Sequence, residues 1–370
     1  LADAFPHNLK ATALLVYHIC GKKPLPESLK RYFPIADRKT TWGKFDERVM
    51  RVVVERWDDD YIWATEEINN STLKICYGKD NRILTREGKF DWGYLKDALW
   101  DGAQLNLVRL RKDDRGEIYY PELIILEPDY LVNITNIANC FTTYAESAVV
   151  NLINKIKPQS NTLAIHLGLL AGRMLDDTIH GRHVSVDESV REFVKDNVLA
   201  LIACSEVRQG FAQFKNDAAV QQRNIDKLIG HDLPQAIGEY NSNDVMLEPT
   251  FFSDVLGIQG RFDLLYEKDG AYTIIEQKSG KGEFVGYNTP GYDPDVPRAR
   301  ECHAVQIILY RALFQYQFNK YAEQLKHLML LYSKYEKGLL MVPQSPELLL
   351  RAIKIRNMIA WSEIMYAQEG

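Results

Sequence analysis

Two carboxylates and one lysine lie in a segment that could assist hydrolysis with a metal ion. Asp263 lies in one predicted strand, 254–266, and Glu276 and Lys278 end the next, 271–278, after an Asp-Gly turn that favours a hairpin. Residues two apart in a strand face the same side, so Glu276 and Lys278 project together and pairing brings Asp263 near Glu276. Mg²⁺ relieves such carboxylate repulsion, and the lysine would orient or activate the attacking water.

An ordinary Glu–Lys ion pair on a surface hairpin is the competing interpretation. Ile and Leu neighbours instead predict a buried strand, and Gly257 and Gly260 indicate a bend or a close approach of the backbone. Gln306 and Tyr310 also lie four apart, on one face of a predicted helix. These observations favour a site over a surface pair.

Read in chain order, the same motifs resemble a known family. Gly-x-x-Gly-Arg-x-Asp, Ile-Glu-x-Lys-Ser-Gly and Gln-x-x-x-Tyr are similar to the RecB branch of the PD-(D/E)xK nuclease superfamily. Within it, the resemblance is to replication and repair helicase–nucleases and to CRISPR-associated RecB-type exonucleases. Residues 126–135 resemble the family's PDxLVSxT segment, and Gly172 to Asp176 lies at its Gly-x-x-x-His motif. The resemblance covers about residues 127–337.

The resemblance implies a metal-dependent deoxyribonuclease that hydrolyses phosphodiester bonds in single-stranded or flapped DNA. Asp263, Glu276 and the backbone carbonyl of Gln277 would hold Mg²⁺ or Mn²⁺, and Lys278 would be the catalytic lysine. Gln306 and Tyr310 would contact or position the DNA. The implied setting is DNA replication, repair or recombination, with a helicase as a fused domain or a separate subunit.

Two alternatives stay open. Asp176 stands where the family has histidine; it can still bind Mg²⁺ or Mn²⁺, with His180, one turn further along, as the lesser candidate. This departure favours a catalytically inactive nucleic-acid-binding scaffold of a helicase, although a retired site has no reason to keep buried Asp263, Glu276 and Lys278. A nuclease of a CRISPR or other defence system is the second alternative.

Many relatives carry a four-cysteine iron–sulfur cluster with three cysteines after the Gln-x-x-x-Tyr motif. Cys140 occupies about the first position, but no cysteine follows Cys302, so we expect no iron–sulfur cluster and a core position for Cys140. No phosphate-binding Gly-x-x-x-x-Gly-Lys-Ser/Thr loop occurs, so we do not expect this chain to hydrolyse ATP itself.

Basic and aromatic residues around the predicted loop 280–297 fit a channel for single-stranded DNA, although a charged loop is more often simply solvated. The DNA-binding candidates are Arg261, Lys281, Arg298 and Arg300, with His303 at the border and Tyr287 and Tyr292 inside the loop. A predicted helix, 346–367, carries Arg351, Lys354, Arg356 and Asn357. It either connects to a motor domain or closes the nuclease domain as an amphipathic helix.

The periodicity of apolar residues predicts an α/β fold: a restriction-endonuclease-like mixed sheet flanked by helices, preceded by a small β-rich module. The module, 1–126, is expected as an antiparallel sheet or barrel of OB type, and the nuclease domain as 127–370. Predicted strands are 60–65, 72–77, 104–110, 119–126, 254–266, 271–278 and 327–332. Predicted helices are 135–156, 163–180, 187–229 with a break near Gly210, 299–320 and 346–367.

The composition excludes some classes of protein. The chain has 370 residues and 45 Lys+Arg against 50 Asp+Glu, and its net charge of −5 excludes a globally basic, histone-like binder but not a local basic groove. The five cysteines are scattered, and the apolar runs are far shorter than the ~20 residues of a membrane span. No secretory leader is recognisable, so we expect a soluble cytoplasmic protein with no membrane partner.

Overall fold

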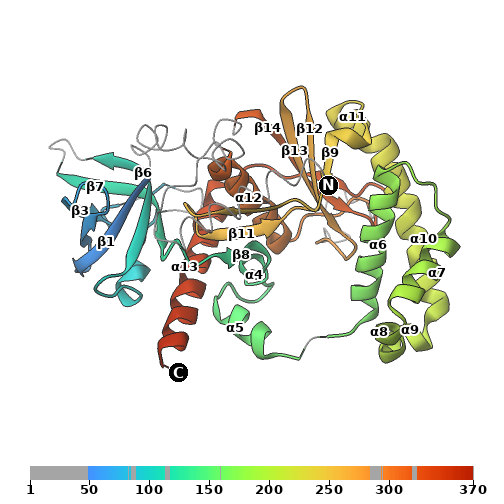
Figure 1. Ribbon diagram of the computed structural model, residues 1–370, viewed down its shortest axis with the longest axis horizontal. Helices are drawn as coiled ribbons and strands as arrows, with labels where there is room; N and C mark the ends of the chain where they lie inside the picture. Colours follow the sequence, from blue (N-terminus) through green and yellow to red (C-terminus); the bar gives the residue numbers. More distant parts are fainter. Residues whose placement is uncertain are drawn as a thin grey trace, which may run out of the picture.

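The computed structural model describes residues 49–81, 83–84, 89–112, 117–158, 160–283, 293, 295–318 and 323–369 (Figure 1). Tyr287 and Tyr292, proposed to lie in a DNA channel, fall outside the described residues, as do residues 1–48 of the predicted N-terminal module. The described part is a mixed α/β structure in which several sheets and helices are combined.

A closed barrel occupies one end of the molecule (Figure 1). Its strands, in the order in which they pair, are β1 (Val49–Trp57), β2 (Tyr61–Glu66), β3 (Thr72–Cys76), β7 (Ile118–Leu126) and β6 (Gln104–Lys112). Buried and more exposed residues alternate along β2, because one face of each strand lines the barrel core. The four strands predicted in this region are confirmed. β1 was missed because Val52, Val53 and Val54 are consecutive and hide the alternation.

A second, mixed sheet forms the centre of the rest of the chain. Its strands, in spatial order, are β15 (Leu339–Met341), β14 (Leu325–Tyr332), β13 (Ala271–Lys278), β12 (Leu264–Lys268) and β9 (Val245–Leu247). β13 and β14 run parallel, whereas β12 and β13 form the predicted antiparallel hairpin. A small sheet of β10 (Thr250–Ser253), β11 (Ile258–Arg261) and β8 (Val132–Asn133) lies beside it.

Helices cover both faces of the central sheet. Ile274 belongs to the core that includes α12 (Glu301–Gln317), whereas its neighbour Ile275 packs into a second core with α6 (Leu163–Ile179) and α10 (Phe211–Lys227). This arrangement, visible in Figure 1, explains why the central strand is apolar on both sides. Among the described helices, none combines the length and the apolar character that a membrane span requires.

Two predicted helices are interrupted in the structure. The expected helix 135–156 is wrong as one element: α4 (Ile134–Ala138) and α5 (Val149–Ile156) are separated by a turn in which Thr142 Oγ1 accepts the Ala145 amide at 3.0 Å. Cys140, two residues after α4, is fully buried, as expected of a core residue. The region 187–229 breaks at Gly210 and also at Asn197 and Cys204 into α7 (Val186–Asp196), α8 (Val198–Ala203), α9 (Ser205–Gln209) and α10.

A buried arginine ties the barrel to the rest of the chain. Arg356, in α13 (Pro346–Glu369), is fully buried, and its guanidinium donates to the carbonyl oxygens of Gly257 (3.0 Å), Leu126, Glu127 (2.7 Å) and Tyr130 (2.5 Å). Gly257 has a φ of +61°, and a Cβ there would lie 2.1 Å from Nη2 of the arginine. The close approach predicted at this glycine is therefore made by an arginine of the same chain.

The other polar residues of α13 also bond within the molecule. The Asn357 side chain accepts the Leu126 amide at 3.0 Å and donates to the Ile124 carbonyl at 2.7 Å. Arg351 pairs with Glu146 and Glu301. These contacts attach α13 to the barrel strand β7 and to α12, and a connection to a motor domain stays a prediction.

Candidate active site

In the hairpin of β12 and β13, the second strand carries the predicted site residues Glu276, Gln277 and Lys278, and Asp263 lies directly before β12. Leu264 pairs with Ile275, so Asp263 is the next residue, level with Glu276 on the neighbouring strand. Asp263 Oδ2 accepts the backbone N–H of Gln277 at 2.7 Å. The predicted strand 254–266 is wrong as one element, because it divides into β11 and β12, which belong to different sheets, with Asp263 at the point of division.

Glu276 lies at the centre of a buried hydrogen-bond network. Its side chain is 5% exposed, and Oε1 accepts from Lys278 Nζ at 2.8 Å and from Gln306 Nε2 at 2.6 Å. Lys278 Nζ donates in addition to Gln306 Oε1 at 2.9 Å. The second oxygen, Oε2, is buried and has no hydrogen-bond partner. An orphaned carboxylate oxygen of this kind is costly unless a ligand satisfies it.

The two carboxylates of the hairpin perturb each other. Burial, followed by the charge of Asp263, raises the pKa of Glu276 to about 8. Burial also raises the pKa of Asp263, although Lys278 and the Gln277 amide oppose that increase. The two carboxyl groups lie close enough for each to affect the pKa of the other, so a proton or a cation between them would relieve their repulsion.

These residues fit a hard divalent cation. Among the described residues, no three His, Cys, Asp or Glu side chains come together closely enough to form a metal site alone. Mg²⁺ needs only one or two carboxylates, because water and phosphate oxygens complete its coordination. Asp263, the orphaned oxygen of Glu276 and the Gln277 carbonyl are suitable donors for such an ion.

Asp176 reaches the same region from α6. Burial, then Glu248 and more weakly Asp263, raises the pKa of Asp176 to about 6, so these three carboxylates influence one another. The exposed ring of His180 instead lies 2.7 Å from the Asp176 backbone oxygen through Nδ1. Asp176 is therefore the better of the two candidates, because the charge of Asp263 raises the pKa of Asp176.

Glu248 was not among the residues predicted from the sequence. It lies between β9 and β10 with a φ of +51°, donates its amide N–H to the Asp263 carbonyl at 2.9 Å, and accepts from Arg261 at 2.9 Å. Its position in a short Leu-Glu-Pro turn gives no pattern that distinguishes it from any solvated acidic residue. Only the folded arrangement places it near Asp263 and Asp176.

Gln306 and Tyr310 are held on α12 behind the carboxylates. They are 6% and 1% exposed, and the Tyr310 hydroxyl donates to the Arg261 carbonyl and accepts from Gln306 Nε2, both at 2.8 Å. Gly260 is required beside them, since a Cβ would lie 2.9 Å from the tyrosine ring. The geometry therefore corresponds to positioning of Glu276 and Lys278, with no exposed surface through which these two side chains touch a strand of DNA.

The predicted basic residues remain exposed around the site, but His303 differs. Arg261, Lys281, Arg298 and Arg300 are all exposed, and Arg261 is paired with Glu248. His303 is partly buried, with Nδ1 2.7 Å from the Tyr332 hydroxyl. Burial, followed by Lys278 and Arg300, lowers the pKa of His303 to about 3. A neutral imidazole at this position adds no positive charge to the border of the loop, and a role of His303 in DNA binding stays a prediction.

Two buried amides of α10 hold the ends of β13 and β14, and sequence reasoning missed both. Gln221 Nε2 donates to the Ser279 carbonyl at 3.0 Å, and Asn224 Nδ2 donates to the Ser333 carbonyl at 2.9 Å. Polar residues within the apolar stripe of a helix were the available indication. They fix the point where β13 and β14 end.

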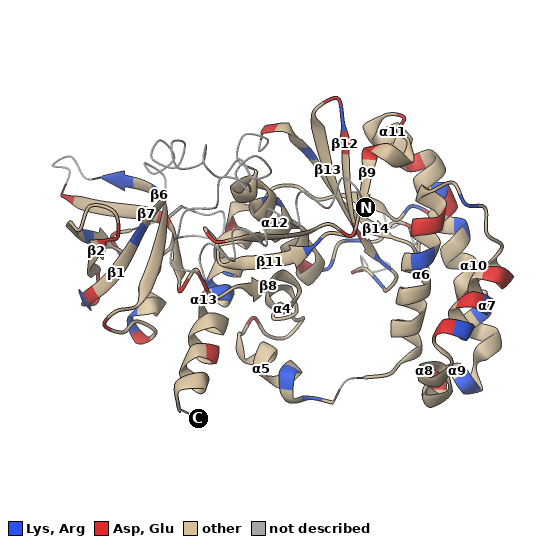
Figure 2. Cartoon of the chain, viewed as in Figure 1, with Lys and Arg blue, Asp and Glu red and all other residues tan. Residues whose placement is uncertain are grey.

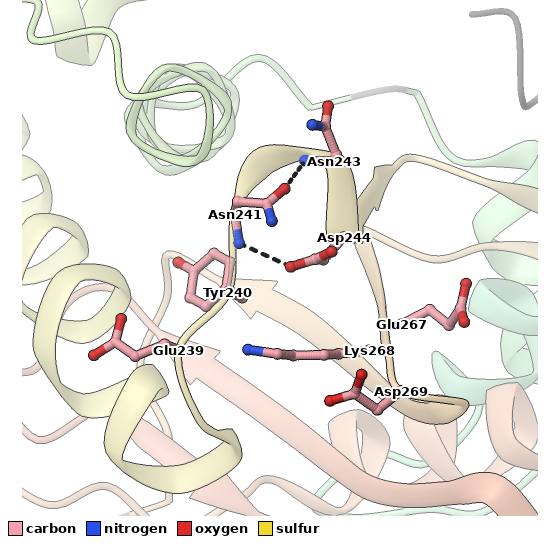
Figure 3. A pocket seen from close by; sticks show the side chains of 8 residues that line it. All are labelled: Glu239, Tyr240, Asn241, Asn243, Asp244, Glu267, Lys268 and Asp269. Carbon is pink, nitrogen blue, oxygen red and sulfur yellow. Dashed lines mark hydrogen bonds between the residues drawn. The ribbon is translucent and has the colours of Figure 1, made fainter.

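A hollow lies at the opposite end of the hairpin, around its Asp269–Gly270 turn (Figure 3). Two of its lining residues, Asn241 and Asp244, stabilise the short helical turn Ser242–Asp244 through a capping box. In it, the backbone N–H of Asn241 donates to Asp244 Oδ2 at 2.9 Å. None of the residues predicted from the sequence lines it, and we assign it no function.

Comparisons with known proteins give little further information. No protein-family model matches the chain, and no curated protein matches it either. Among solved structures, that of a candidate exonuclease from Eubacterium rectale covers 62% of this chain and 78% of its own length, at 13% identity and a TM-score of 0.38. A likeness of this degree establishes neither the fold nor the activity of this chain.

Proposed function

We propose that this chain is a metal-dependent nuclease of the PD-(D/E)xK type that hydrolyses phosphodiester bonds in single-stranded or flapped DNA. One observation carries the proposal: a buried, orphaned oxygen of Glu276 lies beside Asp263, while Lys278 is fixed by the other oxygen and by Gln306. A purely structural ion pair would not need a second buried carboxylate or leave an acceptor unused.

The side chains of the site have distinct roles in this proposal. A bound Mg²⁺ or Mn²⁺ would polarise the phosphate and lower the pKa of bound water. Lys278 has three N–H donors, of which Glu276 and Gln306 take two, so one remains for a phosphate oxygen or the attacking water. Gln306 and Tyr310 hold Glu276 and Lys278 in place, and Asp176 adds negative charge that favours the cation.

The DNA would approach over the exposed basic residues. Arg261, Lys281, Arg298 and Arg300 would bind phosphates, since long cationic side chains supply most of the affinity for a nucleic-acid backbone. The order of the sequence motifs supports placement in the RecB branch and, through it, work beside a helicase in replication, repair or recombination. The same motifs occur in nucleases of CRISPR systems, which the substrate preference would distinguish.

Cleavage of labelled DNA tests the proposal. The parent chain should degrade single-stranded and flapped oligonucleotides with Mg²⁺ or Mn²⁺, and Asp263→Asn and Lys278→Ala should each lower the rate by about 100-fold or more. Lys268→Ala, at the far end of the same hairpin, is the matched control and should retain the parental rate. Equal cleavage by Lys278→Ala and the parent would exclude the assigned chemistry.

One observation favours an inactive scaffold instead: Asp176 stands in the position of the family's histidine. That function predicts binding of DNA without cleavage in either metal, and no change of melting temperature when metal is added. Parallel assays with RNA of the same sequence would define the substrate class.

A further inference from the structure

The outer face of the barrel carries an aromatic–cation strip, which we define as Arg56, Tyr61, Trp63 and Lys74. The Arg56 guanidinium carbon lies 4.1 Å from the centre of the Trp63 ring, and Lys74 Nζ lies 4.0 Å from that of Tyr61 and 5.7 Å from that of Trp63. The two rings are 6.2 Å apart. All four side chains are partly or fully exposed, so they are available to a ligand.

Strand pairing builds this strip across three neighbouring strands. Trp63 on β2 is opposite Arg56 on β1 and opposite Lys74 on β3. A β-bulge follows Val54 in β1, and without that extra residue Glu55 would stand opposite Trp63. The bulge therefore places a cation beside the ring where regular pairing would place an anion.

The strip lies on a barrel whose strand order is that of an OB-type barrel. β1-β2-β3-β7-β6 with β3 parallel to β7 is the arrangement of an OB-type barrel, whose second and third strands commonly bind oligonucleotides. Aromatic rings stack on bases of any sequence, and adjacent cations bind the phosphates. In the described part of the chain, both signs of charge occur on the barrel and on the helices of the opposite end (Figure 2).

We propose that the aromatic–cation strip is a binding site for single-stranded nucleic acid, separate from the hydrolytic site. Bases stack on Trp63 and Tyr61, and Arg56 and Lys74 turn from the rings to the phosphates. The binding does not require the metal or the carboxylates of the hairpin. The strip would therefore hold a strand that the nuclease site has not yet reached or has already released.

The acidic turn between β1 and β2, residues 58–60, affects where along the strip phosphates can lie. Asp58 accepts the amides of Asp60 and Tyr61 at 2.9 and 2.8 Å, and Asp59 pairs with Lys96. This turn adjoins Tyr61, so its negative charges disfavour phosphate there. Phosphates are accordingly favoured at the Arg56 end of the strip, while Tyr61 contacts a base.

Binding measurements on the full chain test the strip without any cleavage. Fluorescence anisotropy with a labelled oligothymidylate in EDTA should give a dissociation constant about tenfold weaker for Trp63→Leu, because leucine fills space but cannot stack. Trp63→Phe should bind nearly as the parent does. Tyr144→Ala, which removes an aromatic side chain that is 96% exposed on another part of the surface, is the control and should leave binding unchanged.

The cations have a separate readout in the salt dependence. Arg56→Ala/Lys74→Ala should decrease the slope of log Kd against log salt by about 1.4, the value for two lost contacts to a single strand. The control Arg191→Ala/Lys195→Ala removes two exposed charges from α7, at the other end of the molecule, and should leave the slope unchanged. Thermal melting of each variant checks folding.

Two results would overturn the proposal: unchanged affinity of folded Trp63→Leu, or an equal decrease in slope for both double variants. Either would leave the ring contacts as stabilisation of the barrel alone. Failure of the nuclease proposal is distinguishable, because Asp263→Asn should lose cleavage and still bind the oligonucleotide in EDTA as tightly as the parent.

Discussion

Two buried charged clusters in this molecule have opposite characters. Arg356 gives its donors to the carbonyl oxygens of Gly257, Leu126, Glu127 and Tyr130. Burial lowers the pKa of Arg356 to about 9, which still leaves it charged at neutral pH. Glu276, by contrast, faces another carboxylate and has an oxygen without a partner.

The difference teaches how to separate structural charge from functional charge. A buried ion whose hydrogen bonds are complete stabilises one arrangement of the chain, and removing it leaves several acceptors unsatisfied. A buried carboxylate with a like charge beside it destabilises the ligand-free protein and is retained for what it binds. Substitutions in the two clusters should therefore change stability in opposite directions.

The largest expected effect on stability is at Arg356. Arg356→Met keeps much of the volume but removes every donor, so we expect the free energy of unfolding to fall by about 3–5 kcal/mol. Arg351→Met on the same helix removes partly exposed ion pairs with Glu146 and Glu301 and should cost less than about 1 kcal/mol. Urea denaturation measures the free energy of unfolding of both variants. Equal losses in the two would contradict this prediction.

At Glu276 the expected sign is reversed. Glu276→Gln removes the cost of burying this carboxyl group beside Asp263, so the metal-free protein should become about 1–2 kcal/mol more stable while the proposed nuclease activity is lost. Glu267→Gln, exposed on β12, should change neither quantity. Calorimetry in EDTA measures the stability, and a clear destabilisation of Glu276→Gln would remove the basis of the contrast.

Metal should stabilise the hairpin cluster and leave the arginine cluster unaffected. Millimolar Mg²⁺ or Mn²⁺ should raise the melting temperature by about 2–4 °C, and EDTA should reverse the change. Asp263→Asn should lose this response, whereas Arg356→Met, although less stable, should keep it. Asp176→Asn should weaken the response only in part, because Asp263 raises the pKa of Asp176 less than Glu248 does.

The smallest effect concerns His303, which lies between the site and the core. Its folded pKa is about 3 against 6.5 for an unperturbed histidine, so the unfolded state binds more protons between these values. Its contribution to stability is therefore present above pH 6.5 and is lost as the pH falls toward 3, by about 1–2 kcal/mol. The free energy of unfolding of His303→Asn, measured by urea denaturation, should fall less steeply with decreasing pH than that of the parent. The control His231→Asn, at an exposed position, should follow the parent.

The strand–turn–strand pattern around Asp269 and Gly270 predicted the hairpin, because local turn chemistry and apolar periodicity act over a few residues. Pairing across so short a turn also predicted that Asp263 lies near Glu276. Glu248, Gln221 and Asn224 could not be found in this way, since their roles arise from packing between segments far apart in the chain. The breaks in the helical regions were also missed where a local cap or turn outweighs apolar periodicity.

The position of Arg356 and Asn357 has a consequence for how the protein is made. Their partners in the barrel precede them by about 230 residues in the chain. At a synthesis rate of 5–20 residues per second, the completed barrel edge would wait roughly 10–50 s for these side chains to be translated. During that interval the carbonyls around Leu126 are open to water or to a chaperone. The barrel and the domain of the central sheet thus reach their final packing only after α13 has been made.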